Sequence, residues 1–135
     1  MTRFRLIMIK TTDTSIYIRI PFMWISVNEA FAWKTKRHKS DKYKEFEDKM
    51  EAFFLNENLE IFDDNWLSVN YRFYFKIYNK DWSKKVKDTF NYEKALTDIL
   101  TKHIKGFKDH KIKGWSCWKF DSEEEYMEIE IQELI

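Results

Sequence analysis

The sequence of 135 residues contains one cysteine, one proline and two glycines. The single cysteine, Cys117, excludes an internal disulfide and a cysteine-rich metal site, and it favours a reducing compartment such as the cytoplasm. Gly and Pro make up roughly 2% of the chain, against about 12% in ordinary proteins, which excludes collagen-like, linker-like and glycine-rich phosphate-loop architectures. No apolar run approaches the ~20 residues of a membrane span, and the first residues carry no secretory signal pattern. We expect a cytoplasmic protein without membrane spans.

Apolar residues are plentiful by comparison. They make up 44% of the chain, and aromatic residues alone make up 19%. Such a chain can bury a core, so intrinsic disorder is not expected. The length predicts a single domain over residues 1–135.

Charge is balanced in total but segregated along the chain. The formal net charge is +1, from 24 Lys and Arg against 23 Asp and Glu. Cations gather in two clusters, at residues 34–44 and 80–87, whereas residues 121–133 carry seven acids and no cation. This segregation can create a basic surface, although solvated loops and a polar strand face explain it equally well.

Alternation of apolar and polar side chains predicts five strands. They cover residues 3–9, 16–20, 69–77, 111–120 and 126–134. Residues 11–14 and 121–124 are predicted turns, and Pro21 ends the second strand. Residues 22–40 form a basic, aromatic stretch without a clean period, and we expect it to be irregular.

Helical periodicity predicts two helices. The first begins at Asp41 and ends near residues 56–58, and its apolar face consists of Tyr43, Phe46, Met50, Phe53 and Phe54. The second covers about residues 89–104, with Gly106 just past its end. Its apolar face consists of Tyr92, Leu96, Ile99, Leu100 and His103.

The resulting element order is ββαβαββ. It predicts an α+β two-layer sandwich in which two helices cover a mixed or antiparallel sheet. Residues 1–13 are an extra strand and turn at the N-terminal side of this unit. Trp115 and Trp118 are expected on opposite faces of their strand. Cys117 is expected to be a buried apolar residue rather than a nucleophile, because nothing nearby predicts a lowered thiol pKa.

The second predicted helix carries polar residues opposite its apolar ones. Asn91, Lys94 and Asp98 are spaced i, i+3, i+7, which places them within about 60° on an ideal helix. Asp88 stands at the start of this helix. The arrangement is either an N-cap followed by an ordinary surface ion pair, or a row of groups that meets a substrate.

Further short motifs surround this helix in a fixed order. Ser26-Val27-Asn28 follows the strand that ends at Pro21, a basic loop and a helix come next, and the long strand precedes Asp88-Thr89-Phe90-Asn91 and Lys94. Gly106 is then followed by Asp109-His110 before another strand. In this order the chain resembles, over residues 15–133, the RusA family of Holliday junction resolvases, most of which are encoded by phages and prophages.

The resemblance implies a RusA-like fold and a homodimer that binds four-way DNA junctions and hydrolyses phosphodiesters with Mg²⁺ or Mn²⁺. Asp88 and Asp109 match acids that hold the metal in this family, and Lys94 matches its catalytic lysine. Asn91 matches the family's asparagine, which we expect to contact DNA. The sequence departs from the family at Phe90, where many members have a second aspartate, and at His110, which replaces the second acid of a pair.

From these matches we expect the metal to be held by Asp88, Asp109, Asp98 and His110. A cation held by carboxylates can activate water and neutralise the charge that grows on the phosphate. Lys94 would add a fixed positive charge to the same phosphate.

We expect DNA backbone contacts from the two basic clusters, since phosphate contacts give affinity that depends on salt and not on sequence. The residues assigned to this role are Lys34, Lys36, Arg37, Lys39, Lys84, Lys85 and Asn91.

Three function classes follow from the sequence. The first is a metal-dependent nuclease that resolves four-way or other branched DNA junctions. The second is a DNA-binding descendant that has lost its metal site at Phe90. The third is a phage-encoded regulator that binds protein through exposed aromatic residues and the acidic last strand.

Overall fold

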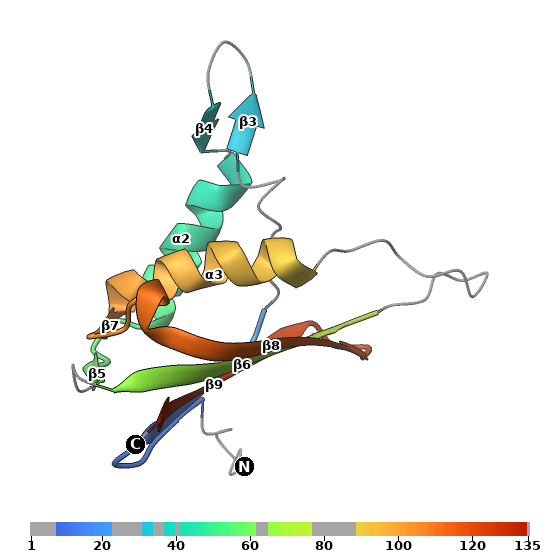
Figure 1. The fold of residues 1–135 in the computed structure, drawn as a ribbon. Coiled ribbons are helices and arrows are strands. Elements are labelled where there is room, and N and C mark those ends of the chain that lie inside the picture. The colour runs from blue at the N-terminus through green and yellow to red at the C-terminus, as the bar shows by residue number, and fades with distance from the viewer. Residues whose placement is uncertain are drawn as a thin grey trace, which may run out of the picture.

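A computed structural model describes residues 8–22, 31–33, 37–39, 41–61, 65–76 and 89–134. Its centre is a mixed sheet of five strands, and the two helices of the described part lie on the same side of that sheet (Figure 1). The observed α+β architecture agrees with the fold class predicted from the sequence. Within the described residues, none of the helices has the length and apolar character needed to cross a bilayer.

The sheet has the strand order β1-β2-β9-β6-β8. The strands are β1 (Ile9–Thr11), β2 (Ser15–Ile20), β6 (Trp66–Phe75), β8 (Ile112–Asp121) and β9 (Tyr126–Leu134). All neighbours are antiparallel except β6 and β8, which run parallel. The strand β8 is therefore an edge strand, and β9 lies between β2 and β6.

The last two strands follow one another along the chain but are not neighbours in the sheet. The strand β6 lies between them, and α3 comes between β6 and β8 in the chain, as expected for a crossover between parallel strands. This order could not be read from alternation, because alternation identifies a buried face but not a pairing partner.

The core lies between the sheet and the helices α2 (Asp41–Phe53) and α3 (Thr89–His103). Four of the five residues predicted for the apolar face of the first helix are buried, and Phe53 packs partly buried against them. In α3, Leu96, Ile99 and Leu100 are buried as predicted, whereas His103 is half-buried and stacks on Phe54 at 4.9 Å between ring centroids. Tyr92 is a residue whose side chain lies outside the described part.

Five short elements complete the described part of the chain. The strands β3 (Phe31–Trp33) and β4 (Arg37–Lys39) form an antiparallel hairpin that extends away from the sheet (Figure 1). The strands β5 (Leu59–Glu60) and β7 (Ile104–Lys105) pair in parallel, and the 3₁₀ turn η1 (Asp109–Lys111) precedes β8.

Three predictions about element boundaries need correction. Residues 22–40 were expected to be irregular, but they contain the β3–β4 hairpin, whose three-residue strands are too short for alternation to identify. The first strand was expected at residues 3–9, but β1 runs over Ile9–Thr11, and residues 3–7 lie outside the described part of the chain. The long strand begins earlier than predicted, at Trp66, because Leu67 continues its buried face.

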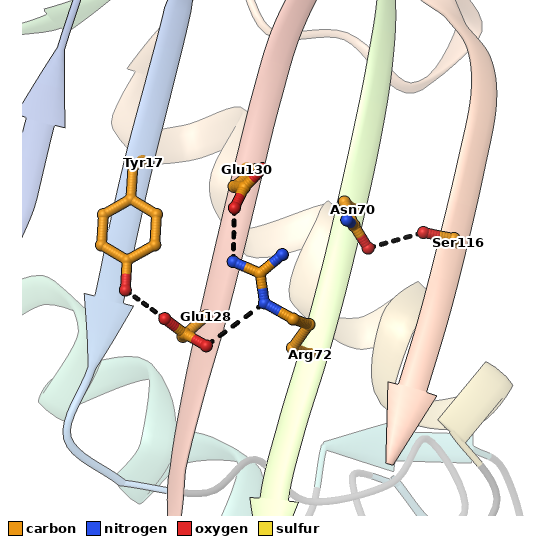
Figure 2. Close-up of polar contacts among 6 residues, drawn as sticks. All are labelled: Tyr17, Asn70, Arg72, Ser116, Glu128 and Glu130. Atoms are coloured by element: carbon orange, nitrogen blue, oxygen red, sulfur yellow. Dashed lines mark hydrogen bonds and ion pairs between the residues drawn. The ribbon is translucent and has the colours of Figure 1, made fainter. Parts of the chain in front are cut away.

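The sheet face opposite the helices carries a polar network (Figure 2). The carboxylate of Glu128 accepts hydrogen bonds from the Tyr17 hydroxyl and from Arg72 Nε, the latter at 3.2 Å. Arg72 Nη2 donates to Glu130, and the Ser116 hydroxyl donates to Asn70 Oδ1 at 2.6 Å. We call this side of the sheet the outer face.

Candidate active site

The helix α3 presents a lysine and an aspartate on its surface. Lys94 and Asp98 are both exposed, one helical turn apart, while Ala95, Leu96 and Ile99 are buried against the sheet. This division is the one that the spacing of the apolar residues predicted. The buried face therefore fixes the rotation of the helix and directs Lys94 and Asp98 away from the core.

A tight turn after α3 brings a second acid to this helix. Gly106 has a φ of 85°, a left-handed conformation that favours glycine. Phe107 is buried in the core, and Lys111 Nζ donates a hydrogen bond to the Gly106 carbonyl at 3.1 Å. These anchors hold the 3₁₀ turn that begins at Asp109, so the fold sets the backbone position of this residue.

The helix and the turn enclose an open cavity of about 240 Å³. It is lined by Glu93, Lys94, Thr97, Asp98, Asp109, Ile112 and Trp115. The cavity thus brings together Lys94, Asp98 and Asp109, three residues predicted from the sequence as parts of one site. We call it the acidic cavity.

The acids of the cavity influence one another electrostatically. Burial raises the pKa of Asp98 above its ordinary value, and the neighbouring Asp109 carboxylate raises it further, while Lys94 and Lys102 oppose the shift. The contribution of Asp109 arises because like charges at short range disfavour each other's ionised forms, and it adds to the larger effect of burial. A cation placed among these carboxylates would relieve the repulsion.

Glu93 also lines the cavity, and sequence reasoning missed it. It is half-buried, and burial raises its pKa, with further contributions from Asp98 and Asp109. Its carboxylate accepts a hydrogen bond of 2.8 Å from the Thr97 hydroxyl, which is itself bonded to the hydroxyl of the fully buried Tyr71. The sequence offered one signal, since Glu93 lies i−4 from a threonine on the edge of the apolar face.

The donor set fits a divalent cation in kind, because Mg²⁺ and Mn²⁺ prefer carboxylate oxygens. It does not form a complete site within the described residues, among which no three acidic, histidine or cysteine side chains gather closely enough to hold a metal ion. Asp88 lies outside the described residues. Among the described residues, His110 is exposed and is not part of the cavity lining, unlike its neighbour Asp109.

The predicted DNA contacts fall mostly outside the described structure. Lys34, Lys36, Lys84 and Lys85 belong to segments that it does not describe. The backbones of Arg37 and Lys39 form β4 of the hairpin, and Asn91 belongs to the first turns of α3, but their side chains are outside the description.

The structure supports the interpretation of two further residues. Cys117 is half-buried, and burial, with a smaller contribution from Glu93, raises the pKa of its thiol to about 12, so the thiol is a weak nucleophile at neutral pH. Trp115 lines the acidic cavity, whereas Trp118, three residues along β8, pairs with Arg72 of the outer face. The two indoles therefore lie on opposite faces, as predicted.

Comparison with known proteins identifies the family. A search of curated proteins found no matching relative. A family model described as endodeoxyribonuclease RusA matches residues 25–132. This range contains both helices, the turn with Asp109 and every described residue of the acidic cavity. The chain therefore belongs to the RusA family of endodeoxyribonucleases.

Proposed function

We propose that this protein is a divalent-metal-dependent endonuclease that resolves four-way or other branched DNA junctions by hydrolysing phosphodiester bonds. The observation that carries the proposal is the acidic cavity, in which Lys94 lies beside Asp98 and Asp109 in a chain of the RusA family. Hydrolysis of a phosphodiester requires positive charge close to the non-bridging oxygens and a water molecule that can lose a proton.

The acids of the cavity would hold the metal, which is Mg²⁺ or Mn²⁺. Asp98 and Asp109 contribute hard oxygen ligands from the helix and from the turn, and Asp88 is proposed as a further ligand. Glu93 is a candidate for the acid that is missing at Phe90, since it lines the same cavity. A bound divalent ion supplies a polarised water and charge neutralisation.

The chain's own residues would perform the remaining tasks. Lys94 supplies an ammonium group that attracts the scissile phosphate and stabilises its growing negative charge. Thr97 holds the Glu93 carboxylate by a hydrogen bond, which limits its rotation. Trp115 forms an apolar wall of the cavity, against which the substrate can pack.

The proposed assembly is a homodimer acting in the cytoplasm of a bacterial host, with a phage or prophage origin. A four-way junction presents two equivalent strands, and a two-fold dimer can cut both symmetrically. The basic residues at 34–39 and 84–85 are proposed to contact the phosphates of the arms.

The test is cleavage of a synthetic four-way junction with Mg²⁺ or Mn²⁺. We expect Lys94→Ala, Asp98→Asn and Asp109→Asn each to lose at least about 100-fold in the single-turnover rate, the scale observed when one charge-stabilising group is removed. Lys105→Ala and Asp48→Asn are the matched controls, because both residues are exposed and lie outside the acidic cavity. Equal rates in all variants would contradict the proposed site.

A second candidate function is junction binding without cleavage. Two observations favour it. Phe90 occupies a position where an acidic metal ligand is expected. The described residues contain no group of three His, Cys, Asp or Glu side chains that could hold a metal ion. Salt-sensitive junction binding with no cleavage in either metal would select this alternative.

A further inference from the structure

A row of aromatic rings crosses the outer face of the sheet. The ring of Tyr126 stacks on Tyr74 at 4.1 Å with an interplanar angle of 7°, and Tyr74 stacks on Phe120 at 5.0 Å and 18°. Arg19 lies 4.1 Å from the ring centroid of Tyr126 at the opposite end. The row therefore runs from β2 through β9 and β6 to β8, and a guanidinium covers one end of it.

The other end of the row lies on the edge strand β8. Phe120 is 39% exposed, and Trp118, two residues earlier on the same face, is 57% exposed. Both belong to β8, which is an edge strand of the five-stranded sheet and has β6 as its neighbour. An additional flat ring can therefore stack on Phe120 or Trp118 without displacing any residue of the row.

The row is held in place by the polar network of Figure 2. Glu128, which Figure 2 shows bound to Tyr17 and Arg72, also accepts a hydrogen bond from Tyr74, so the Tyr74 ring is fixed at its hydroxyl. A preorganised ring loses little freedom when a ligand stacks on it, which favours binding. The outer face thus resembles a stacking surface more than a set of independent surface side chains.

The charge of this face favours an anionic ligand. Strand positions on the outer face carry two acids, Glu128 and Glu130, and four cations, Lys10, Arg19, Arg72 and Lys113. Arg72 pairs with both acids. The acids of the turn 121–125 follow Phe120 directly, so an anionic chain would run the other way along β8, from Trp118 toward Lys113.

That direction leads to the acidic cavity. Trp115 lies between Lys113 and Trp118 on the same strand, and its side chain lines the cavity on the helix side. The six residues from Lys113 to Trp118 span about 16 Å of strand, the length of about five stacked nucleotides. One edge strand thus separates a stacking surface from the proposed site of cleavage.

We propose that the outer face of β8 binds an unpaired single-stranded segment of the DNA substrate, with bases stacked on Trp118 and Phe120. The inference rests on the proposed nuclease function, which supplies the DNA substrate. Its test measures binding alone and does not require cleavage. Aromatic rings beside cations bind single strands with little dependence on sequence. A duplex cannot use this surface, because its bases are already stacked on both faces, so the surface would distinguish branched or frayed DNA from intact duplex.

The test is the affinity of an oligo(dT) of about 12 nucleotides, a length suited to one stacking surface, measured by fluorescence anisotropy without metal. We expect Trp118→Ala to weaken binding about 5- to 100-fold, the usual effect of removing one stacking partner, and Trp118→Phe to retain most of the affinity. Leu55→Ala removes an apolar side chain that is 67% exposed elsewhere, and it should bind like the wild type. The wild type should bind an abasic strand of the same length more weakly than oligo(dT). This difference should be smaller for Trp118→Ala, which keeps only Phe120 as a stacking partner.

Several outcomes would overturn the proposal. Equal binding of oligo(dT) and the abasic strand would reduce the contact to phosphate attraction. Unchanged affinity in Trp118→Ala and in Phe120→Leu would remove the stacking surface. Conversion of a dimer to a monomer by Trp118→Ala, with unchanged oligo(dT) affinity per chain, would assign the face to a second copy. Cleavage and oligo(dT) binding test the two proposals separately. An Asp109→Asn variant that is defective in junction cleavage should keep its affinity for oligo(dT).

Discussion

Thr97→Val is expected to destabilise the fold because it removes the hydrogen-bond partner of the buried Tyr71 hydroxyl. Tyr71 is fully buried, and its hydroxyl bonds to Thr97, which in turn donates to Glu93. Valine keeps the shape of threonine but removes the hydroxyl, so the Tyr71 hydroxyl loses this partner inside the core. Leaving a buried donor unsatisfied costs about 1–3 kcal/mol, and we expect the free energy of unfolding to fall by that amount.

Tyr71→Phe should reverse much of this loss. The single variant Tyr71→Phe leaves Thr97 bonded to Glu93, so it should cost about 1 kcal/mol or less. In the double variant both buried hydroxyls are absent, and only the half-buried Glu93 loses a donor. We therefore expect Thr97→Val/Tyr71→Phe to be more stable than Thr97→Val alone by about 1 kcal/mol, a coupling that a double-mutant cycle measures.

Urea unfolding of the four proteins at neutral pH provides the measurement, with Thr97→Ser as the control that keeps the hydroxyl. Independent sites have a coupling energy within about 0.3 kcal/mol of zero. Such a value would refute the hydrogen-bonded series from Tyr71 through Thr97 to Glu93. The same outcome would weaken the proposal that Thr97 orients Glu93 in the acidic cavity.

Two further predictions concern the outer face and the turn that carries Asp109. Glu128→Gln should lower stability by about 1–3 kcal/mol at neutral pH, because the carboxylate accepts bonds from Arg72 and two tyrosines. Burial alone would raise the pKa of Glu128, but these hydrogen bonds outweigh it and lower the pKa. The difference in stability between Glu128→Gln and the wild type should therefore shrink as the pH falls through the carboxyl range. Urea titrations at several pH values would show this change, and a constant difference would contradict it. Gly106→Ala should cost about 1 kcal/mol or more, since alanine is strained at a φ of 85°, and it should slow junction cleavage because the turn carries Asp109. Urea unfolding and single-turnover rates test this second prediction, and wild-type values in both would refute it.

Element type followed from sequence pattern where a buried face is regular. In α2, the spacing of Tyr43, Phe46 and Met50 matches the helical period, and all three are buried. In β9, Met127 and Ile129 alternate with acids, and they are buried too. The periods of a helix and a strand are local properties, so the sequence of one segment is enough to predict its type.

Such patterns could not predict how the elements are arranged in space. The same alternation in β8 and β9 suits strands that are neighbours and strands that have another strand between them. The β3–β4 hairpin has too few residues to produce a period. Pairing depends on contacts between segments far apart in the sequence, which the pattern of one segment does not contain.

The candidate site was predicted in part. Lys94 and Asp98 followed from spacing on one helix, whereas Asp109 was assigned through resemblance to the RusA family. Glu93 was missed, because it lies next to Lys94 in the sequence and its place in the cavity depends on the packing of α3 against β8. A residue at the margin of an apolar face is assigned only when the neighbouring element is known.

The central position of β9 has a consequence for the order of folding. The strand is the last in the sequence and forms ladders with β2 and with β6. Until it is inserted, β1 with β2 and β6 with β8 can only be two separate ribbons, because β9 is the strand that joins β2 to β6. The sheet must therefore close around its final strand after synthesis of that segment, which favours slow, non-local folding and makes chaperone dependence a property to examine in the cell.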